Sequence, residues 1–409
     1  MNGQGSIKHI MPIFFEKVRQ KSVLLALFFL PFIALNPGFN FNIGDIFLVI
    51  AFALSISKFR LVNRVQIVLL LFMLSILISI WLSLFWRSSQ IEITNYAQFF
   101  FIFVLLVPFG YTIFRDIRFD SIARVMVLSG VINAFFAIMQ FLFPGLGFLA
   151  GQKIVKVLNL GFRATGLVTN PNELGFVLNI SLIMCLYLII TEKSRIMRIL
   201  YIGTGMFIFV GALSTINKSS LLMLPVVIFL YIFGMRKIKI IIIALSILIL
   251  AVSFLYFLPF ADLYIDAYNY RISADESLES RLQGYKKAVD APEEWILAGS
   301  GIYSDKYSID VKHRIHNQVL GLAMQSGFIS AFLFLAINVL VILYWFRKSK
   351  YDPMSLLIFV LLLSSFVMSQ FKTQSFYRID YIPMMLGISY MIYGNSHHAI
   401  EKEFKNKQA

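Results

Sequence analysis

Two of the chain's five histidines lie three residues apart, where a long polar stretch changes into an apolar one. They are His313 and His316, and on a helix this spacing places both imidazoles on one face. Histidine can exchange a proton near neutral pH, and the adjacent cations Lys312 and Arg314 favour the neutral imidazole that a general base needs. The pattern predicts proton-transfer chemistry, with His316 as the candidate base and His313 as its neighbour. A histidine that only caps a helix at a membrane interface is the alternative.

Two histidines at this spacing could also hold a metal ion, but no Glu or Cys completes a compact ligand set beside them. The chain also has no phosphate-binding P-loop, no GxSxG motif and no dinucleotide-binding glycine pattern. We therefore expect neither a metal site nor a bound cofactor.

A second group of residues that could do chemistry is basic. Arg163 precedes the segment Asn170-Pro171-Asn172, which predicts a helix start with its first asparagine as the cap. An arginine beside a helix N-terminus is a favourable environment for a diphosphate, although an ordinary capped turn would have the same sequence. Solvated loop charge is the alternative for every member of this group. The other candidates for an anion site are Lys218, Arg271 and Arg281.

The elements that must position these residues are membrane-spanning helices. The chain is 59% hydrophobic, has a mean hydropathy of +0.80 and is only 14% charged, whereas soluble domains are about 25% charged. Continuous apolar runs of about 20 residues predict an all-α membrane protein, since barrel strands would alternate. The twelve expected spans are 22–35, 41–57, 65–85, 96–114, 121–143, 172–190, 198–214, 219–234, 239–259, 316–346, 354–371 and 380–394.

The net charge of +15 follows the loops between these spans. Every second loop carries three Lys or Arg residues, which predicts cytoplasmic termini and an outer loop over 261–315. Because the charge is not gathered on one face, we do not expect nucleic-acid binding. The N-terminus is polar through Lys21, so no cleavable signal peptide is expected. The organisation predicted is one integral membrane domain, 1–409, with 261–315 inserted.

Other polar features lie at expected helix ends. Asp45 stands near the start of an early span, where an acid is a functional candidate or a helix cap. Within the outer loop, 277–289 predicts a short helix that ends before Pro292, and Gly299-Ser300-Gly301 predicts a turn.

The order of these elements resembles the O-antigen ligase and polymerase superfamily. The resemblance rests on Arg281 before a glycine turn, on His316-Asn317-Gln318 at the start of a span, and on Gln325-Ser326-Gly327 about ten residues later. Two further segments resemble family elements, and the resemblance covers roughly 40–390. These segments are Asn42-Ile43-Gly44-Asp45 and the stretch from Arg163-Ala164-Thr165-Gly166 to Asn170-Pro171-Asn172-Glu173-Leu174.

The resemblance implies a bacterial inner-membrane glycosyltransferase that polymerises O-antigen or capsule-type repeat units on its periplasmic face. The implied partners are a polyprenyl-diphosphate-linked oligosaccharide donor, a glycan acceptor and membrane lipid, and a chain-length regulator could act with them. A ligase that transfers the glycan to the lipid A-core is the alternative within this class. A transporter or flippase of an anionic lipid-linked glycan is the alternative outside it.

By position, the resemblance also implies roles for individual residues. His316 would take a proton from the acceptor hydroxyl. The implied diphosphate-binding residues are Arg163, Arg281 and Lys218, and the implied supporting residues are His313, Asn317 and Arg271. Where the family often has Ser-Arg-Gly, this chain has 217–220 as Asn-Lys-Ser-Ser. Lysine supplies charge there but lacks the two-point geometry of arginine.

Overall fold

The computed structural model describes residues 4–33, 42–59, 61, 63–86, 93–143, 155–156, 162–168, 170–217, 317–350, 352–371 and 378–394, with isolated positions between 223 and 299. Within these residues the chain is helical apart from one pair of short antiparallel strands, β1 (Val155–Lys156) and β2 (Phe162–Arg163). The predicted all-α class is therefore correct except for this pair.

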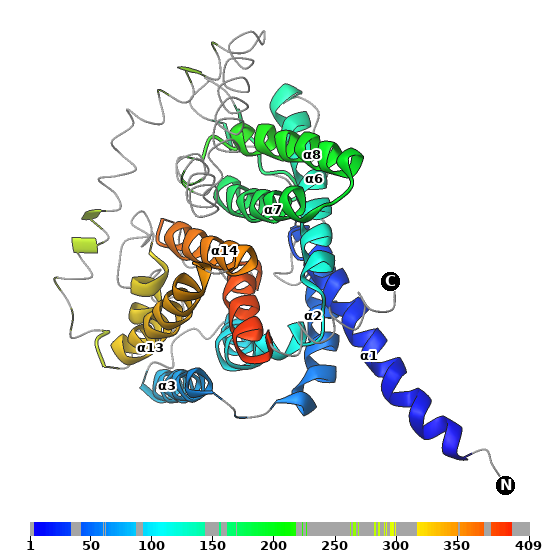
Figure 1. Ribbon diagram of the computed structural model, residues 1–409. Coiled ribbons are helices and arrows are strands. Elements are labelled where there is room, and N and C mark those ends of the chain that lie inside the picture. The colour runs from blue at the N-terminus through cyan, green and yellow to red at the C-terminus, as the bar shows by residue number, and fades with distance from the viewer. Residues whose placement is uncertain are drawn as a thin grey trace.

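The helices form a bundle in which segments far apart in the sequence lie side by side (Figure 1). A π-helical stretch, η3, and short helical turns interrupt some of them. The helical elements are α1 (Gln4–Phe29), α2 (Ile43–Ser55), η2 (Ile56–Lys58), α3 (Arg64–Trp86), α4 (Ile93–Phe100), η3 (Phe101–Leu106), α5 (Val107–Phe109), η4 (Gly110–Phe114), α6 (Phe119–Leu142), α7 (Pro171–Thr191), α8 (Arg195–Ser214), α13 (Gln318–Ser349), α14 (Pro353–Ser369), η7 (Arg378–Tyr381) and a helix over 382–394.

Six helical runs among the described residues are long and apolar enough to cross a membrane. Ten of the predicted spans overlap described helices, and the other two, 219–234 and 239–259, lie outside the described residues apart from isolated positions. The first predicted span, 22–35, overlaps the C-terminal part of α1, which begins at Gln4 and ends at Phe29. Residues 4–21 continue the same helix ahead of the predicted span.

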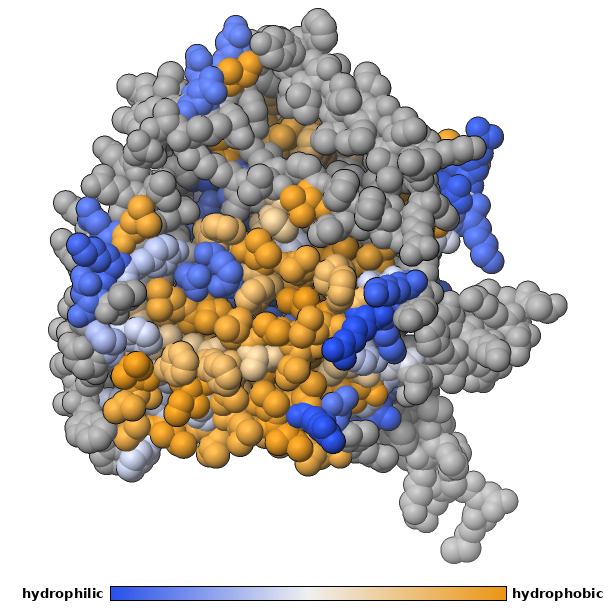
Figure 2. Space-filling view, turned by 60° about the vertical axis from the view of Figure 1, so that its left-hand side comes forward, coloured by the Kyte–Doolittle hydropathy of each residue, from blue (hydrophilic) through white to orange (hydrophobic). Residues whose placement is uncertain are grey.

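The surface of the spanning helices is apolar on the outside as well as on the inside. On α3, Leu69 and Phe72 are fully buried, whereas Leu71 and Leu74 on the opposite face are about half exposed. A helix that is apolar all round is typical of a membrane span. Figure 2 shows the resulting broad apolar surface on the side of the molecule where α3 and α13 lie. The protein is thus suited to lie within a lipid bilayer.

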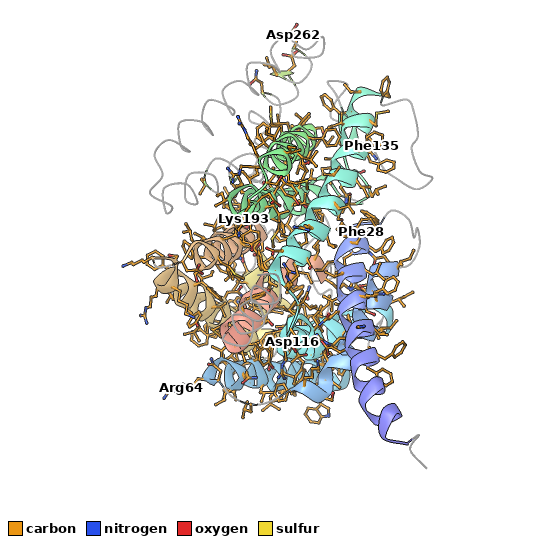
Figure 3. The ribbon with its side chains drawn as sticks, turned by 45° about the vertical axis from the view of Figure 1, so that its right-hand side comes forward. Phe28, Arg64, Asp116, Phe135, Lys193 and Asp262 are labelled. Atoms are coloured by element: carbon orange, nitrogen blue, oxygen red, sulfur yellow. The ribbon has the colours of Figure 1, made fainter. Side chains whose placement is uncertain are left out.

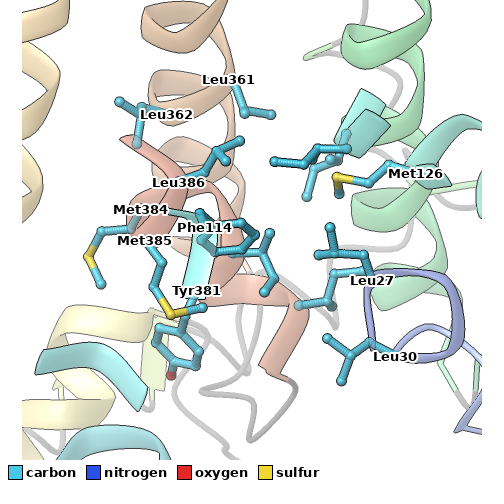
Figure 4. Close-up of a cluster of buried hydrophobic side chains, with 14 of the residues drawn as sticks. Leu27, Leu30, Phe114, Met126, Leu361, Leu362, Tyr381, Met384, Met385 and Leu386 are labelled. Carbon is cyan, nitrogen blue, oxygen red and sulfur yellow. The ribbon is translucent and has the colours of Figure 1, made fainter. Parts of the chain in front are cut away.

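Small residues let α6 pack closely against two neighbours. A side chain on Gly130 would come within 2.4 Å of Ser181 on α7, and one on Gly211 of α8 would come within 2.5 Å of Ala134. Close contacts of this kind are typical of helices that associate in membranes. Side chains from α1, η4, α6, α14 and the 382–394 helix meet in the core shown in Figure 4, which includes Leu27, Phe114, Met126, Leu361 and Met385.

Helix α13 is broken in its first third. Gly327 has φ 86° and ψ 162°, a conformation that is not helical and that glycine adopts without strain. Residues 318–326 therefore form a short helical arm, which we call the α13 arm, followed by a longer membrane-spanning part.

Candidate functional site

The predicted site residues divide into two sets. Arg163 and Asn317 lie within the described part of the chain. The remaining candidates lie outside the described residues, and their roles stay predictions; they are His313, His316, Lys218, Arg271 and Arg281. The site is therefore built from Arg163, from Asn317 and from the side chains around them.

Asn317 begins the α13 arm. Its backbone is extended, and its side-chain oxygen accepts a hydrogen bond of 2.8 Å from the N–H of Leu320. This is an N-cap interaction, which satisfies one of the free N–H groups of the first turn. The helix therefore begins at Gln318, and the candidate base His316 directly precedes the cap in the sequence.

Arg163 lies between the end of one helix and the start of another. Its Nε donates to the carbonyl of Thr215 at 3.2 Å, just after α8, and an Nη2 hydrogen bond of 3.0 Å reaches Oδ1 of Asn172 in the first turn of α7. Asn170 caps α7 by accepting from the N–H of Asn172, with Pro171 next in sequence, as the sequence predicts. A buried guanidinium thus lies beside a helix N-terminus, which is an environment that favours anions.

Two buried amides on α6 hold the turn that follows Arg163. The Gln140 oxygen accepts from the N–H groups of Thr165 and Gly166, each at 2.9 Å, and its nitrogen donates to the Gly166 carbonyl at 3.0 Å. The Asn133 oxygen accepts from the N–H of Leu167 at 3.1 Å. Buried backbone groups need such partners, so these two side chains fix the turn and, with it, the position of Arg163.

Asp45 has two roles in the structure. Its Oδ2 accepts from the N–H of Asn42 at 2.8 Å while the Asn42 side chain accepts from the Asp45 N–H, which together form a capping box. Its Oδ1 lies 3.0 Å from Nε of Arg378, in an ion pair between two buried side chains that is not aligned as a hydrogen bond. Asp45 therefore takes part in the helix cap, which was one of the two alternatives, and it also pairs with Arg378, whereas its standing as a functional candidate stays a prediction.

The turn η7 brings several helix starts together. Arg378 pairs with Asp45 of α2, and the hydroxyl of Tyr381 is hydrogen-bonded by Gln318, the first residue of the α13 arm. Glu173 in the first turn of α7 is close enough to interact electrostatically with the same hydroxyl. The starts of α2, α7 and α13 thus converge on one buried polar turn.

Part of the predicted outer loop, 261–315, docks at the break in α13. The N–H of Phe328 donates to the carbonyl of Ile296 at 3.0 Å. Gly299, with φ +77°, lies so close to α13 that a side chain would meet the backbone of Gln325 at 2.4 Å. Met324 packs against Trp295 and its neighbours Tyr285 and Leu320. The two glycine motifs noted in the sequence are therefore in contact.

Sequence reasoning missed part of this arrangement. The roles of Arg378, Tyr381, Glu173 and Gln140 were not predicted from the sequence. One signal was available, because an acid such as Asp45 within a membrane protein predicts a charged partner. The identity of that partner depends on packing between distant segments.

The chain matches no family model, and none of the curated proteins matches it significantly. Inference about function must therefore come from its own residues. They combine a guanidinium at a helix N-terminus, a buried ion pair and a helix capped by Asn317. A guanidinium beside a helix N-terminus can bind an anionic group.

Proposed function

We propose that the protein is a membrane glycosyltransferase that polymerises glycan repeat units carried on a polyprenyl diphosphate. The reaction would take place at the outer face of a bacterial inner membrane, with both termini in the cytoplasm. The observation that supports this proposal is convergence on η7. The segments 42–45, 170–173 and 316–318, which resemble three elements of one superfamily, each contribute at least one residue to the interactions around Arg378–Tyr381.

In the proposed reaction His316 removes the proton from an acceptor hydroxyl. The hydroxyl oxygen attacks the anomeric carbon of the donor sugar, and the bond from that carbon to the diphosphate oxygen breaks. Negative charge develops on the leaving diphosphate, where Arg163 and the N-terminus of α7 would stabilise it. Arg281 and Lys218 are proposed to add charge at the same place. A general base contributes about 10²–10⁴-fold to such a reaction.

The decisive experiment supplies the purified protein with a polyprenyl-diphosphate-linked repeat unit and measures chain growth. We expect His316→Ala and Arg163→Ala to abolish growth at unchanged membrane abundance, and His313→Ala to have a milder effect. Near-normal growth with His316→Ala would remove the catalytic base from the proposal. Equal losses for both histidine variants would mean that their ranking is wrong.

A gene deletion separates polymerase from ligase. Loss of a polymerase leaves single repeat units on the lipid core, whereas loss of a ligase leaves polymer attached to its carrier. Reconstituted vesicles test the transporter alternative. Movement of the lipid-linked glycan across the membrane, without any transfer of glycan, would contradict the enzyme proposal.

A further inference from the structure

Tyr381 lies at the centre of the buried turn, where it touches elements from three parts of the chain. Its side chain is 1% exposed, and its ring centroid lies 5.5 Å from that of Phe103 in η3 and 6.4 Å from that of Phe334 in α13. Its hydroxyl is hydrogen-bonded by Gln318, which is also buried. Figure 4 shows Tyr381 at the edge of the apolar core formed by the neighbouring helices.

The two contacts with α13 come from opposite sides of its break. Gln318 begins the α13 arm, whereas Phe334 belongs to the part beyond Gly327. In a straight helix these two residues would be about 24 Å apart, at 1.5 Å per residue. The change of direction at Gly327 helps both to reach the same tyrosine. Tyr381 therefore ties the α13 arm to the membrane-spanning part of the same helix.

The start of the α13 arm bears directly on the proposed base. Asn317 caps the arm and Gln318 is its first residue, so His316 precedes the tyrosine's hydrogen-bond partner by only two residues. Tyr381 is buried against apolar rings, and its hydrogen bond with Gln318 connects it to the start of the α13 arm.

We propose that Tyr381 is a positioning residue for glycan transfer: through Gln318 it fixes the start of the α13 arm and thereby acts on His316, two residues earlier in the sequence. This inference rests on the proposed function, because it assumes that His316 acts as the base. It adds a requirement that the family resemblance did not include, namely a tyrosine hydroxyl from the last helical segment.

The chain offers a matched control. Tyr111 is fully buried, and its hydroxyl accepts a hydrogen bond from Nε2 of Gln66. Tyr111→Phe therefore removes the same kind of buried Gln–Tyr hydrogen bond from η4, an element that carries no candidate site residue. Tyr381→Phe and Tyr111→Phe should lower the melting temperature by similar amounts.

The test measures kcat and KM for chain growth per folded molecule. For Tyr381→Phe we expect kcat to fall on the order of 10²-fold, the effect of a displacement of about 1 Å, with KM for the donor nearly unchanged. Gln318→Leu should give a similar fall, and the double variant should be no worse than the more severe single variant, because both remove one interaction. Tyr111→Phe should leave kcat within about twofold of the wild type.

Two results would overturn the inference. The first is a normal kcat in an otherwise active protein. If Tyr381→Phe keeps a kcat within about twofold of the wild type, as Tyr111→Phe should, Tyr381 has only a packing role. If the wild-type protein shows no transfer, the proposed function fails, and thiol labelling still tests the positioning. In a Cys185→Ser, His316→Cys background, Tyr381→Phe should change the alkylation rate at position 316 at least severalfold and Tyr111→Phe should not. An unchanged rate would contradict the inference.

Discussion

The N–H of Phe328 donates a hydrogen bond of 3.0 Å to the carbonyl of Ile296. Phe328 directly follows the break at Gly327, so this N–H lies where the regular ladder of α13 is interrupted. The carbonyl belongs to the predicted outer loop, 261–315. Loop and helix thus complete each other's backbone hydrogen bonding, and the α13 arm is held from the loop side as well as by Tyr381.

Gly299→Ala should disrupt this docking. The positive φ of Gly299 costs a residue with a side chain about 1–2 kcal/mol, and the added carbon would meet the Gln325 carbonyl oxygen at 2.4 Å. We expect a lower melting temperature and a strong loss of chain growth. Gly203→Ala is the control, because a side chain at Gly203 in α8 has no atom within 4 Å. Equal melting temperatures for the two variants would contradict the docking.

The Asp45–Arg378 pair should be important for stability. Both side chains are buried, and removal of one partner of a buried ion pair costs about 3–5 kcal/mol because the other charge is left uncompensated. Asp45→Asn and Arg378→Gln should each lower the melting temperature, and the double variant should lose less than the sum of the two. Strictly additive losses would show that the two side chains are not coupled.

An exposed pair supplies the control for that experiment. Arg118 and Asp120 are 3.2 Å apart, with side chains 58% and 36% exposed. Surface pairs of this kind contribute about 0–1 kcal/mol. Arg118→Gln should therefore change the melting temperature little.

Gln140→Leu should loosen the turn that carries Arg163. The substitution leaves the buried N–H groups of Thr165 and Gly166 without their acceptor, at about 1–3 kcal/mol each. If Arg163 binds the donor diphosphate, KM for the donor should rise in this variant. Asn338→Leu is the control, since the buried Asn338 side chain donates to the Phe334 carbonyl of its own helix. An unchanged KM for the donor in Gln140→Leu would show that this turn has no role in donor binding.

Acid should weaken the contact between α1 and the segment after α2. Glu16 pairs with Arg19 and Lys58. Burial raises the pKa of Glu16, but hydrogen bonds from and charges of the two cations outweigh burial and lower the pKa from 4.5 to about 2. A lowered pKa stabilises the folded state at pH values above the ordinary pKa of 4.5. This contribution to stability is lost as the pH falls towards the pKa of the folded state.

The measurement is the difference in melting temperature between the wild type and Glu16→Gln. It should be constant near neutral pH and shrink as the pH falls from about 4.5 to about 2. In a Lys58→Gln background the difference should be smaller throughout, because one of the two cations is gone. If the difference in melting temperature grows as the pH falls, the pKa of Glu16 is not lowered in the folded protein.

The predicted orientation can be tested by labelling single cysteines with an impermeant reagent. Asp290 and Arg64 are both exposed, and the native Cys185 is buried. Figure 3 shows Asp262, near the start of the predicted outer loop, at the opposite end of the molecule from Arg64 and Asp116. In intact cells Asp290→Cys should react and Arg64→Cys should react only after permeabilisation. The reverse pattern would invert the topology and place the proposed site in the cytoplasm.

The sequence by itself determined the membrane class and most helix boundaries. A chain in lipid must satisfy its backbone internally, so long apolar runs become helices. Caps depend on a few neighbouring residues, and the predicted start of α7 at Asn170 was correct for that reason. The helix that contains the first predicted span begins at Gln4, well before residue 22, and the span prediction did not include this extension.

Tertiary structure alone decided which of these local features meet. The pairing of Asp45 with Arg378, the contact of Gly299 with Gln325 and the hydrogen bond of Gln318 with Tyr381 each join segments with no common local pattern. Nor does a single glycine in an apolar run reveal whether a helix breaks there. At Gly327 the break accompanies the docking of the Ile296 carbonyl, and such a long-range contact is formed only in the folded protein.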